Sequence, residues 1–183
     1  MPIIQSVERA LQILDLFNDQ ATELKITEIS KQMGLSKSTL HSLLKTLQLH
    51  GYIDQNPDND KYCLGMKLVE RGHFVVGTMD IRQKAKSWLS ALSQETGQTT
   101  HLGILDGNEG VYIEKIEGKQ AASAYSRIGR RLPAHATAIG KVLLAWLGDE
   151  ELTALLDGYA FTGFTPATLT DRDALLAALA QTR

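Results

Sequence analysis

The stretch from Ile26 to Tyr52, ITEISKQMGLSKSTLHSLLKTLQLHGY, constrains the fold more than any other part of the chain. It predicts two short helices joined by a tight turn, because Thr27 can cap the first helix and Gly34 can adopt the positive φ that ends it. Ser36 can cap the second helix, whose leucines recur at helical spacing: Leu40, Leu43, Leu44 and Leu47. The opposite side then carries short polar or cationic side chains: Lys37, Ser38, His41, Ser42 and Lys45. This layout predicts a helix-turn-helix that reads DNA, with an ordinary helical hairpin as the alternative.

The flanking residues extend this pair into a winged domain. A short strand is expected at Tyr52 to Gln55, a turn at Asn56 to Asp60 and a returning strand at Lys61 to Leu64. A helix from Ser6 to Asn18, capped by Ser6, should precede the pair. Its predicted inner face consists of Val7, Ala10, Leu11, Leu14 and Phe17. The predicted winged helix-turn-helix domain therefore spans residues 1–65.

Length and composition allow a second domain and exclude several classes of protein. The 183 residues, 43% of them apolar, suffice for two small domains with hydrophobic cores. No run approaches the ~18 to 20 apolar residues of a membrane span, and the N-terminus lacks the pattern of a secretory signal. The single cysteine, Cys63, cannot form an internal disulfide. We therefore expect a cytoplasmic protein.

The charge distribution favours DNA binding more than the net charge does. The whole chain carries −2, and residues 1–65 hold six Lys or Arg against eight Asp or Glu. Ser36 to His50, however, contains two lysines and two histidines and no acid. Local potential at the docking face governs binding. Three acids at the wing, Asp54, Asp58 and Asp60, argue against a wing that binds the phosphate backbone strongly.

The remaining residues predict a linker helix and an α/β domain. Residues 66–79 are expected to form a mostly apolar helix that either contacts a second copy or packs on the winged domain. Residues 80–183 should form the second domain. A helix at Asp80 to Thr96, ended by Gly97, should bury Ile81, Ala85, Trp88, Leu89 and Leu92.

The second domain should continue with an antiparallel hairpin, Gln98 to Leu105 and Val111 to Ile116. A third strand is expected at Ala121 to Ile128, and Gly129 to Pro133 should break the pattern. The next helix, Thr137 to Leu147, should bury Ile139, Val142, Leu143 and Trp146. Two further helices are expected at Asp149 to Asp157 and Asp171 to Thr182, separated by a loop with a possible short strand at Tyr159 to Leu169.

Several separated motifs together resemble the IclR-type transcription regulators. They are SVERALQIL at Ser6 to Leu14, GLSKSTLHSLLKTLQLHGY at Gly34 to Tyr52, YCLG at Tyr62 to Gly65, TGQTTHLGILDG at Thr96 to Gly107, and IGRRLPAHATAIGKVLLA at Ile128 to Ala145. The resemblance implies an α+β chain with an N-terminal winged helix-turn-helix, a linker helix that helps dimerisation, and a GAF- or profilin-like effector-binding domain. It also implies homodimers, often dimers of dimers, on a double-stranded DNA operator.

Carried over residue by residue, the resemblance places Lys37, Ser38, Thr39 and His41 at the start of the recognition helix. Many relatives have Arg at the position of Ser42, so the site preference is expected to differ. The predicted DNA-binding set is Thr27, Ser36, Lys37, Ser38, Thr39, His41, Ser42, Lys45 and Lys61. A winged module that binds another protein instead of DNA is the alternative, and a much shallower salt dependence would distinguish it.

For the effector, the resemblance places the small or apolar residues Ala124, Leu132 and Ala138 at the cavity. The arginines of SRIGRR, with Ser126, Arg127, Arg130 and Arg131, stand next to a helix N-terminus, which suits a carboxylate or phosphate. Similar sequences occur in family members that control sugar-acid catabolism, so we expect a sugar acid or related 2-keto acid. Alternatively, these arginines are solvated or pair with Glu114, Glu117 or Asp149.

The pattern of titratable residues does not predict an enzyme. The histidines His41, His50, His73, His101 and His135 are scattered, and Cys63 has no base nearby in sequence. A zinc site between His101 and His135 is a minor alternative. The GK at Gly140 and Lys141 lacks the other residues of a phosphate-binding loop. We expect no metal and no cofactor.

Relatives with this pattern continue past the position of Arg183 with strands that complete the effector sheet. The resemblance therefore implies that the chain is a fragment or a truncated product, with an incomplete pocket. We expect it to bind effector weakly or not at all, and micromolar binding in titration calorimetry with sugar acids would contradict this. A truncated regulator without ligand response is thus an alternative.

Overall fold

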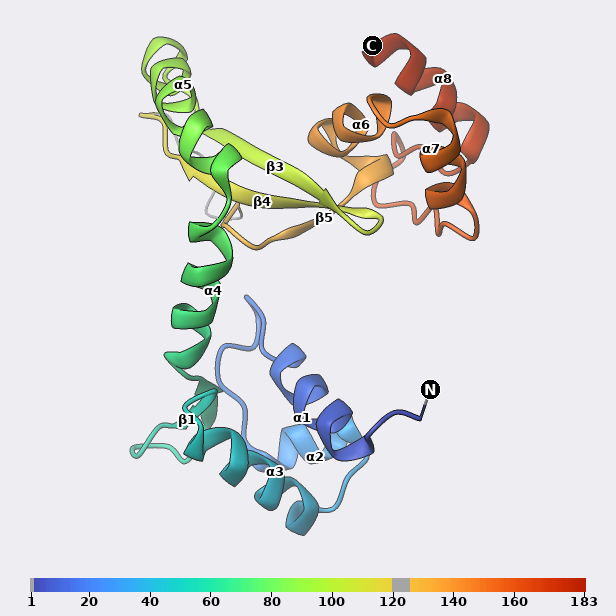
Figure 1. The fold of residues 1–183 in the computed structure, drawn as a ribbon. Coiled ribbons are helices and arrows are strands. Elements are labelled where there is room, and N and C mark those ends of the chain that lie inside the picture. The colour runs from blue at the N-terminus through green and yellow to red at the C-terminus, as the bar shows by residue number, and fades with distance from the viewer. Residues whose placement is uncertain (1, 120–125) are drawn as a thin grey trace. The chain divides into compact units, whose positions relative to one another are not determined.

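A computed structural model describes residues 2–119 and 126–183. The chain forms two compact units, Met1–Thr78 and Met79–Arg183 (Figure 1). In the part of the chain that is described, no helix is both long enough and apolar enough to cross a membrane.

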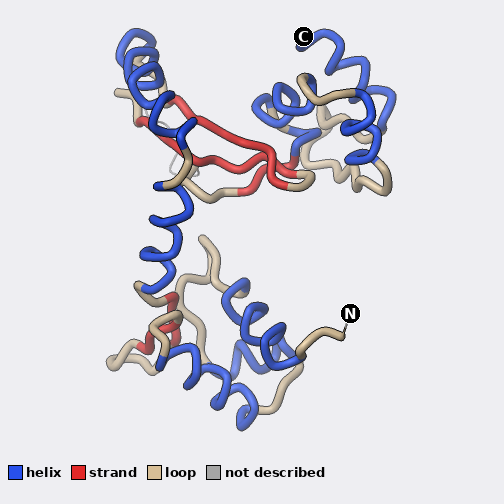
Figure 2. Tube along the Cα trace, viewed as in Figure 1, coloured by secondary structure: helices blue, strands red, loops and turns tan. Residues whose placement is uncertain are grey.

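The first unit is a winged helix-turn-helix. It consists of α1 (Gln5–Asp15), α2 (Ile26–Met33), α3 (Lys37–Leu49), β1 (Ile53–Gln55), β2 (Tyr62–Leu64) and α4 (Lys67–Gly77) (Figure 2). β1 and β2 pair antiparallel and form the predicted wing. The core contains residues from every element before α4: Ile13, Phe17, Leu24, Ile29, Leu40, Leu44, Ile53 and Tyr62. The stripe predicted for α3 is confirmed, since Leu40 and Leu44 are buried and Leu43 and Leu47 pack against them.

The inner face predicted for α1 is partly wrong. The helix begins at Gln5 without a side-chain cap, so Ser6 is not its cap, and Ile13 is the residue it buries. Val7 and Leu11 are exposed. They line an open groove of about 490 Å³ between α1 and α3. The reason is that α1 reaches the core only through its C-terminal half and the following Phe17.

The start predicted for α2 is also wrong. Its N-cap is Lys25, whose N–H donates to the Glu28 carboxylate at 2.7 Å, and Thr27 lies within the first turn. Leu24 makes two backbone hydrogen bonds with Tyr62 of β2, so the helix begins as soon as the chain leaves that pairing. Gly34, with φ of 63°, ends the helix as predicted.

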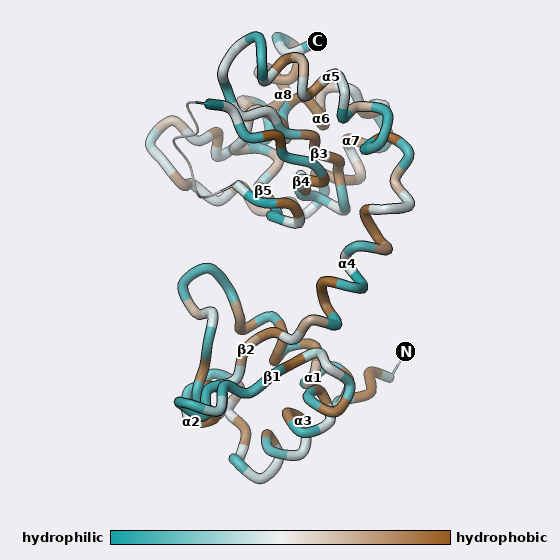
Figure 3. The backbone as a smooth tube through the Cα atoms, turned by 90° about the vertical axis from the view of Figure 1, so that its left-hand side faces the viewer, coloured by the Kyte–Doolittle hydropathy of each residue, from teal (hydrophilic) through white to brown (hydrophobic). Residues whose placement is uncertain are grey.

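α4 falls inside the predicted linker segment and buries none of its residues. Its large apolar side chains Val69, Phe74 and Val75 are all exposed. Figure 3 shows the hydropathy along this helix. Packing on the winged domain, one of the two alternatives, is therefore not observed.

The second unit places helices against a small sheet. It consists of α5 (Asp80–Thr96), β3 (Thr100–Asp106), β4 (Glu109–Ile116), β5 (Arg131–Pro133), a 3₁₀ turn (Ala134–Ala136), α6 (Ala138–Ala145), α7 (Asp149–Leu156) and α8 (Arg172–Thr182). The sheet is antiparallel in the order β3-β4-β5. A second core joins α6, α7 and α8: Ala134, Leu144, Ala145, Leu152, Leu156, Leu175 and Leu179.

Glycines allow α6 to pack closely in this unit. A Cβ on Gly103 of β3 would lie 2.5 Å from the Ile139 side chain. A Cβ on Gly140 would lie 2.4 Å from the backbone of Ala134. The N-terminus of α6 is therefore held tightly between the sheet and the turn that precedes it.

Several expectations for this unit need correction. The break predicted at Gly129 to Pro133 is confirmed only at its start, where Gly129 lies in a turn with φ of 83°. Arg131 to Pro133 instead form the strand β5, because they pair with Glu109 to Val111. Most of the third strand predicted at Ala121 to Ile128 lies outside the described residues, and Tyr159 to Leu169 contains no strand.

The buried sides of two helices also differ from the prediction. The side chains of Ile81, Trp88 and Leu92 in α5, of Val142 in α6 and of Trp146 just after α6 are exposed. α5 contacts the sheet along another side, and α6 buries Leu144 and Ala145 towards α8. Helix periodicity identified the apolar residues, but the packing partners decide which of them are covered.

Candidate nucleic-acid interface

The N-terminus of α3 carries a cluster of hydroxyl groups. The Ser36 Oγ accepts the Thr39 N–H at 3.3 Å, which confirms Ser36 as the cap. The same oxygen lies 2.9 Å from the Ser38 hydroxyl and 3.0 Å from the Thr39 hydroxyl. All three residues are exposed. The cluster therefore presents hydrogen-bonding groups at the positive end of the helix dipole.

The outer face of α3 is polar and contains no acid. Lys37, Ser38, His41, Ser42 and Lys45 are all exposed, on the side opposite the buried Leu40 and Leu44. Such groups can reach phosphate oxygens and base edges from within a major groove. The arrangement predicted for this face is therefore present.

Two hydroxyls on α3 are used by the helix itself. The Ser42 Oγ donates to the Ser38 carbonyl at 3.4 Å, and the Thr46 Oγ1 donates to the Ser42 carbonyl at 2.9 Å. Side chains bonded in this way lie close to the helix. On this face, Lys37, His41 and Lys45 have the longest side chains, and all three are exposed.

The wing is tied to the segment before α2 by a carboxylate that sequence reasoning missed. Glu23 accepts hydrogen bonds of 3.0 Å from the side chains of Asn56 and Asn59. These two bonds, with a contribution from the positive charge of Lys61, hold the pKa of Glu23 below its usual range. From the sequence, Asn56 and Asn59 were predicted only to form a turn. Lys61 is half-buried and lies in the field of this acid, which weakens the case for it as a phosphate contact.

The wing also contains the free cysteine. Cys63 is half-buried on β2, and burial together with the nearby acids Asp54 and Glu23 raises the pKa of its thiol. A thiol that stays protonated is a poor nucleophile. The site therefore offers no sign of cysteine chemistry.

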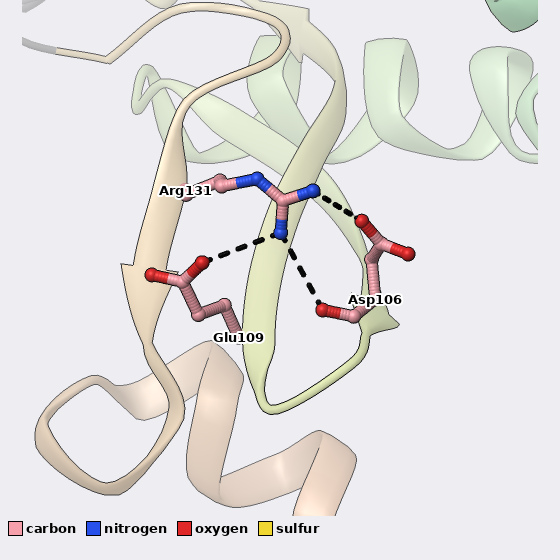
Figure 4. A network of polar contacts seen from close by, with 3 residues as sticks. All are labelled: Asp106, Glu109 and Arg131. Atoms are coloured by element: carbon pink, nitrogen blue, oxygen red, sulfur yellow. Dashed lines mark hydrogen bonds and ion pairs between the residues drawn. The ribbon is translucent and has the colours of Figure 1, made fainter. Parts of the chain in front are cut away.

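In the second unit, Arg131 is already paired. Its guanidinium donates to the Asp106 carboxylate and, at 3.3 Å, to Glu109 (Figure 4). These acids raise the pKa of Arg131, mainly through the Asp106 hydrogen bond. The expected partners are engaged elsewhere, since Glu114 pairs with Arg82 at 3.1 Å and Glu117 with Lys115 at 3.0 Å.

The other residues predicted for the effector are spread along β5 and its flanks: Ser126, Arg127 and Arg130 precede the strand, Leu132 belongs to it, and Ala138 begins α6. Thr137 caps this helix, accepting the Gly140 N–H at 3.2 Å. Leu132 is buried and Ala138 exposed, while Ser126 and Arg130 are half-buried and Arg127 is exposed. Ala124 lies outside the described residues.

The two histidines proposed for zinc have separate environments. The His135 side chain is buried and bonds Tyr159 and Thr162, whereas His101 stacks on Tyr112 with ring centroids 4.4 Å apart. Within residues 2–119 and 126–183, no group of three or more His, Cys, Asp or Glu side chains could hold a metal ion.

Comparison with known proteins identifies the family. A sequence profile described as "Bacterial transcriptional regulator IclR C-terminal" matches residues 73–183, and one described as "IclR helix-turn-helix domain" matches residues 6–57. The chain belongs to the IclR family. It is a DNA-binding transcription regulator and not an enzyme.

Named relatives and solved structures agree with this assignment. The chain is 84% identical to the Escherichia coli regulator XynR over 183 residues, which cover the whole chain and 73% of XynR. It is 39% identical to E. coli KdgR, over 98% of the chain and 68% of KdgR. The crystal structure of Thermotoga maritima IclR, at 32% identity, has a TM-score of 0.71 over 98% of this chain and 72% of that one.

A further solved relative contains a small molecule. An IclR homolog from Microbacterium hydrocarbonoxydans was crystallised with 4-hydroxybenzoate. This IclR-type regulator is 30% identical to the chain, with a TM-score of 0.80 over 96% of the chain and 72% of the homolog. The IclR-type fold, with an N-terminal winged helix-turn-helix and a C-terminal effector domain, is therefore established for this chain.

Proposed function

We propose that this IclR-family chain is a repressor of a catabolic operon and reads its operator with α3. The observation that carries the DNA-binding surface is the exposed, acid-free face of this helix, on which Lys37, His41 and Lys45 have the longest side chains. In this proposal the lysines contact phosphates and His41 contacts base edges, with Thr39 and the hydroxyls of Ser36, Ser38 and Ser42 nearby. Thr27 and Lys61 are secondary contacts.

The proposed effector is a small carboxylate, with a sugar acid or 2-keto acid preferred. The relative with 4-hydroxybenzoate supports a carboxylate ligand for a domain of this type. Arg127 and Arg130, with Ser126, are the preferred donors, and Ala124, Leu132 and Ala138 would shape the cavity. Arg131 would have to exchange its ion pairs with Asp106 and Glu109 for the ligand.

Control of DNA binding is proposed to act through paired chains. Homodimers, or dimers of dimers, would place two α3 helices on one operator, with the exposed apolar residues of α4 contributing to the contact. Effector and operator would favour different arrangements of the pair, with a coupling free energy of typically ~1 to 3 kcal/mol. Repression is preferred because two relatives, E. coli IclR and AllR, are named repressors.

The test of the DNA-binding surface uses an operator selected from a random DNA library. The double variant Lys37→Ala, Lys45→Ala should bind all sequences more weakly, and its salt dependence should fall by about 0.9 per lost phosphate contact. His41→Gln should instead change which bases are preferred. Lys86→Ala with Lys119→Ala, on the other unit, is the matched control and should bind like the unmodified chain.

Unchanged operator affinity in the Lys37, Lys45 double variant would refute the assignment of this face. A shallow salt dependence of the unmodified chain would favour a protein-binding module instead. Titration of the selected complex with sugar acids then tests the effector, and release of the operator is the expected result.

A further inference from the structure

The wing turn, residues 56–61, uses the amide oxygens of its two asparagines for its own backbone. The Asn56 Oδ1 accepts the Asp58 N–H at 2.9 Å. The Asn59 Oδ1 accepts the Lys61 N–H, also at 2.9 Å. Such bonds define the conformation of a turn. The two side-chain NH2 groups point away from the turn, and both donate to the Glu23 carboxylate at 3.0 Å. We refer to Glu23, Asn56 and Asn59 as the wing clamp.

The wing clamp requires a carboxylate at position 23. One Glu23 oxygen accepts from Asn56 and the other from Asn59. Glutamine has a single acceptor oxygen, and its NH2 group would face the NH2 group of one asparagine. Neither asparagine can turn its amide over without losing the bond that its oxygen makes within the turn. Replacing Glu23 with glutamine should therefore open the clamp, although the two side chains have nearly the same shape.

The strands of the wing do not depend on the clamp. Leu24, next to Glu23, exchanges two backbone hydrogen bonds with Tyr62, of 2.9 and 2.8 Å. Leu24, Ile53 and Tyr62 are buried in the core of the first unit. Loss of the clamp should therefore release the wing turn and leave the fold of the unit in place. The clamp thus determines the position of an exposed turn.

The turn that the clamp holds is acidic. Asp58 and Asp60 are exposed in it, and Asp54 is exposed on the adjoining strand β1. β1 begins four residues after α3 ends, and Ile53 of β1 shares the core with Leu44 of α3. When α3 lies in a major groove, the wing therefore lies close to the same duplex. At physiological ionic strength charges interact over about 8 Å, so the position of the turn decides which phosphates its carboxylates repel.

We propose that Glu23 is a positioning residue for operator recognition. Through Asn56 and Asn59 it holds the acidic wing turn at one place beside the duplex, where the turn repels DNA that α3 enters in a wrong orientation. A turn that is free to move would swing away from the phosphates and lose this discrimination. Specificity is a difference between two affinities, and a repulsive group that acts on the wrong complex increases it. This role rests on the proposed placement of α3 in the operator.

The test compares affinity for an operator selected from a random library with affinity for random-sequence duplex at one salt concentration. Glu23→Gln should strengthen binding to random-sequence DNA. The ratio of the two affinities should fall by about threefold to tenfold, since repulsion between close charges in water is worth about that factor. Asn59→Asp sets two carboxylates against each other and should lower the ratio as well, although it changes the net charge in the opposite direction.

The double variant Glu23→Gln, Asn59→Asp rebuilds the clamp with the carboxylate on the other side. The amide oxygen introduced at position 23 accepts from Asn56, and its NH2 group donates to the carboxylate introduced at position 59. That carboxylate can still accept the Lys61 N–H. The net charge equals that of the unmodified chain, and the ratio should be restored. Glu8→Gln removes the same charge from an exposed position of α1 and is the matched control, with an unchanged ratio expected.

Affinity cleavage gives a second readout, which a purely structural role of Glu23 would not change. Iron–EDTA attached to Asp58→Cys, in a Cys63→Ser background, cuts the DNA strands beside the wing turn. Cleavage of the operator should be confined to a few nucleotides while the clamp is intact. It should spread over many nucleotides in Glu23→Gln and become confined again in the double variant.

An unchanged affinity ratio in Glu23→Gln, or a ratio that the double variant does not restore, would overturn the proposal. Equally confined cleavage with and without the clamp, or no cleavage of the operator, would do the same. The Lys37→Ala, Lys45→Ala variant tests α3 separately. Weaker operator binding in that variant, together with an unchanged ratio in Glu23→Gln, would overturn the wing proposal and leave the proposed DNA-binding surface intact.

Discussion

The imidazole Nδ1 of His135 lies 3.0 Å from the phenolic oxygen of Tyr159, in a part of the second unit where the His135 side chain is buried. The other ring nitrogen, Nε2, lies 3.0 Å from the Thr162 carbonyl oxygen. A carbonyl oxygen can only accept, so Nε2 carries the proton and Nδ1 accepts the Tyr159 hydroxyl. These two bonds join the turn before α6 to the segment between α7 and α8.

Tyr159→Phe should lower the free energy of unfolding of the second unit by about 1 to 3 kcal/mol, because the buried Nδ1 loses its donor. Urea denaturation followed by circular dichroism measures the change. Tyr112→Phe is the matched control, since its hydroxyl has no hydrogen-bond partner among the described residues, and its effect should stay within about 0.5 kcal/mol. Equal effects of the two variants would show that the Tyr159 hydroxyl contributes nothing specific.

Two leucines on α3 should respond very differently to truncation. Leu44 is fully buried in the first core, whereas Leu49 is 80% exposed. Leu44→Ala should therefore cost about 2 to 5 kcal/mol of unfolding free energy, and Leu49→Ala less than about 0.5 kcal/mol. Thermal melting of the first unit distinguishes them. A large loss on Leu49→Ala would mean that this residue is covered in solution, for example by a second chain.

Two glycines should respond to alanine with opposite sign. A Cβ on Gly140 would overlap the backbone of Ala134, so Gly140→Ala should destabilise the second unit by about 1 to 3 kcal/mol. Gly72 lies inside α4 with open space around it, so Gly72→Ala should stabilise that helix by about 0.5 to 1 kcal/mol. Melting temperatures of the two variants should move in opposite directions. A stabilising Gly140→Ala would mean that the turn before α6 can move away.

Elements with strong local signals were predictable from the sequence. Gly34 and Ser36 fixed the end of α2 and the start of α3, and Asp171 fixed the start of α8. The outer face of α3 followed from the same periodicity, so the candidate DNA-binding surface was largely predictable. Such signals act within a few residues along the chain and depend little on the rest of the fold.

Features that depend on distant partners were not predictable in the same way. β5 exists because Arg131 to Pro133 pair with Glu109 to Val111. This pairing also brings the Arg131 guanidinium next to the Asp106 carboxylate. Likewise, Trp88 is apolar at helical spacing and still exposed. The spacing of apolar residues along a helix does not determine which of its apolar sides packs on the sheet, because that depends on the position of the sheet.

His101 should make the stability of the second unit depend on pH. Burial, and to a smaller extent the charge of Lys115, lowers the pKa of His101, and its buried Nε2 has no hydrogen-bond partner in the described part of the chain. Because the pKa is lower in the folded state, the unfolded chain binds the proton first as pH falls. The free energy of unfolding should therefore decrease below about pH 6.5.

The variant His101→Phe keeps an aromatic ring against Tyr112 but cannot titrate, so it should lose less stability between about pH 7 and pH 5. Lys115→Met removes the nearby positive charge and should give an intermediate decrease. Urea denaturation at several pH values measures these slopes. Identical slopes for the unmodified chain and His101→Phe would rule out a contribution from this histidine.

Ser42→Arg should increase DNA affinity and change the preferred sequence. Ser42 is exposed on the outer face of α3, and among the described residues its hydroxyl bonds the Ser38 carbonyl alone. An arginine side chain at this position can bind a phosphate or, through two hydrogen bonds, a guanine.

If the introduced guanidinium binds a phosphate, the slope of log affinity against log salt should steepen by about 0.9 for all sequences. If it binds a base, selection from a random library should instead show a new guanine at one position, worth about 1 to 3 kcal/mol against other bases. Ser42→Ala removes the hydroxyl without adding charge and should leave the slope unchanged. An unchanged slope and an unchanged selected sequence in Ser42→Arg would mean that this side of α3 does not face DNA.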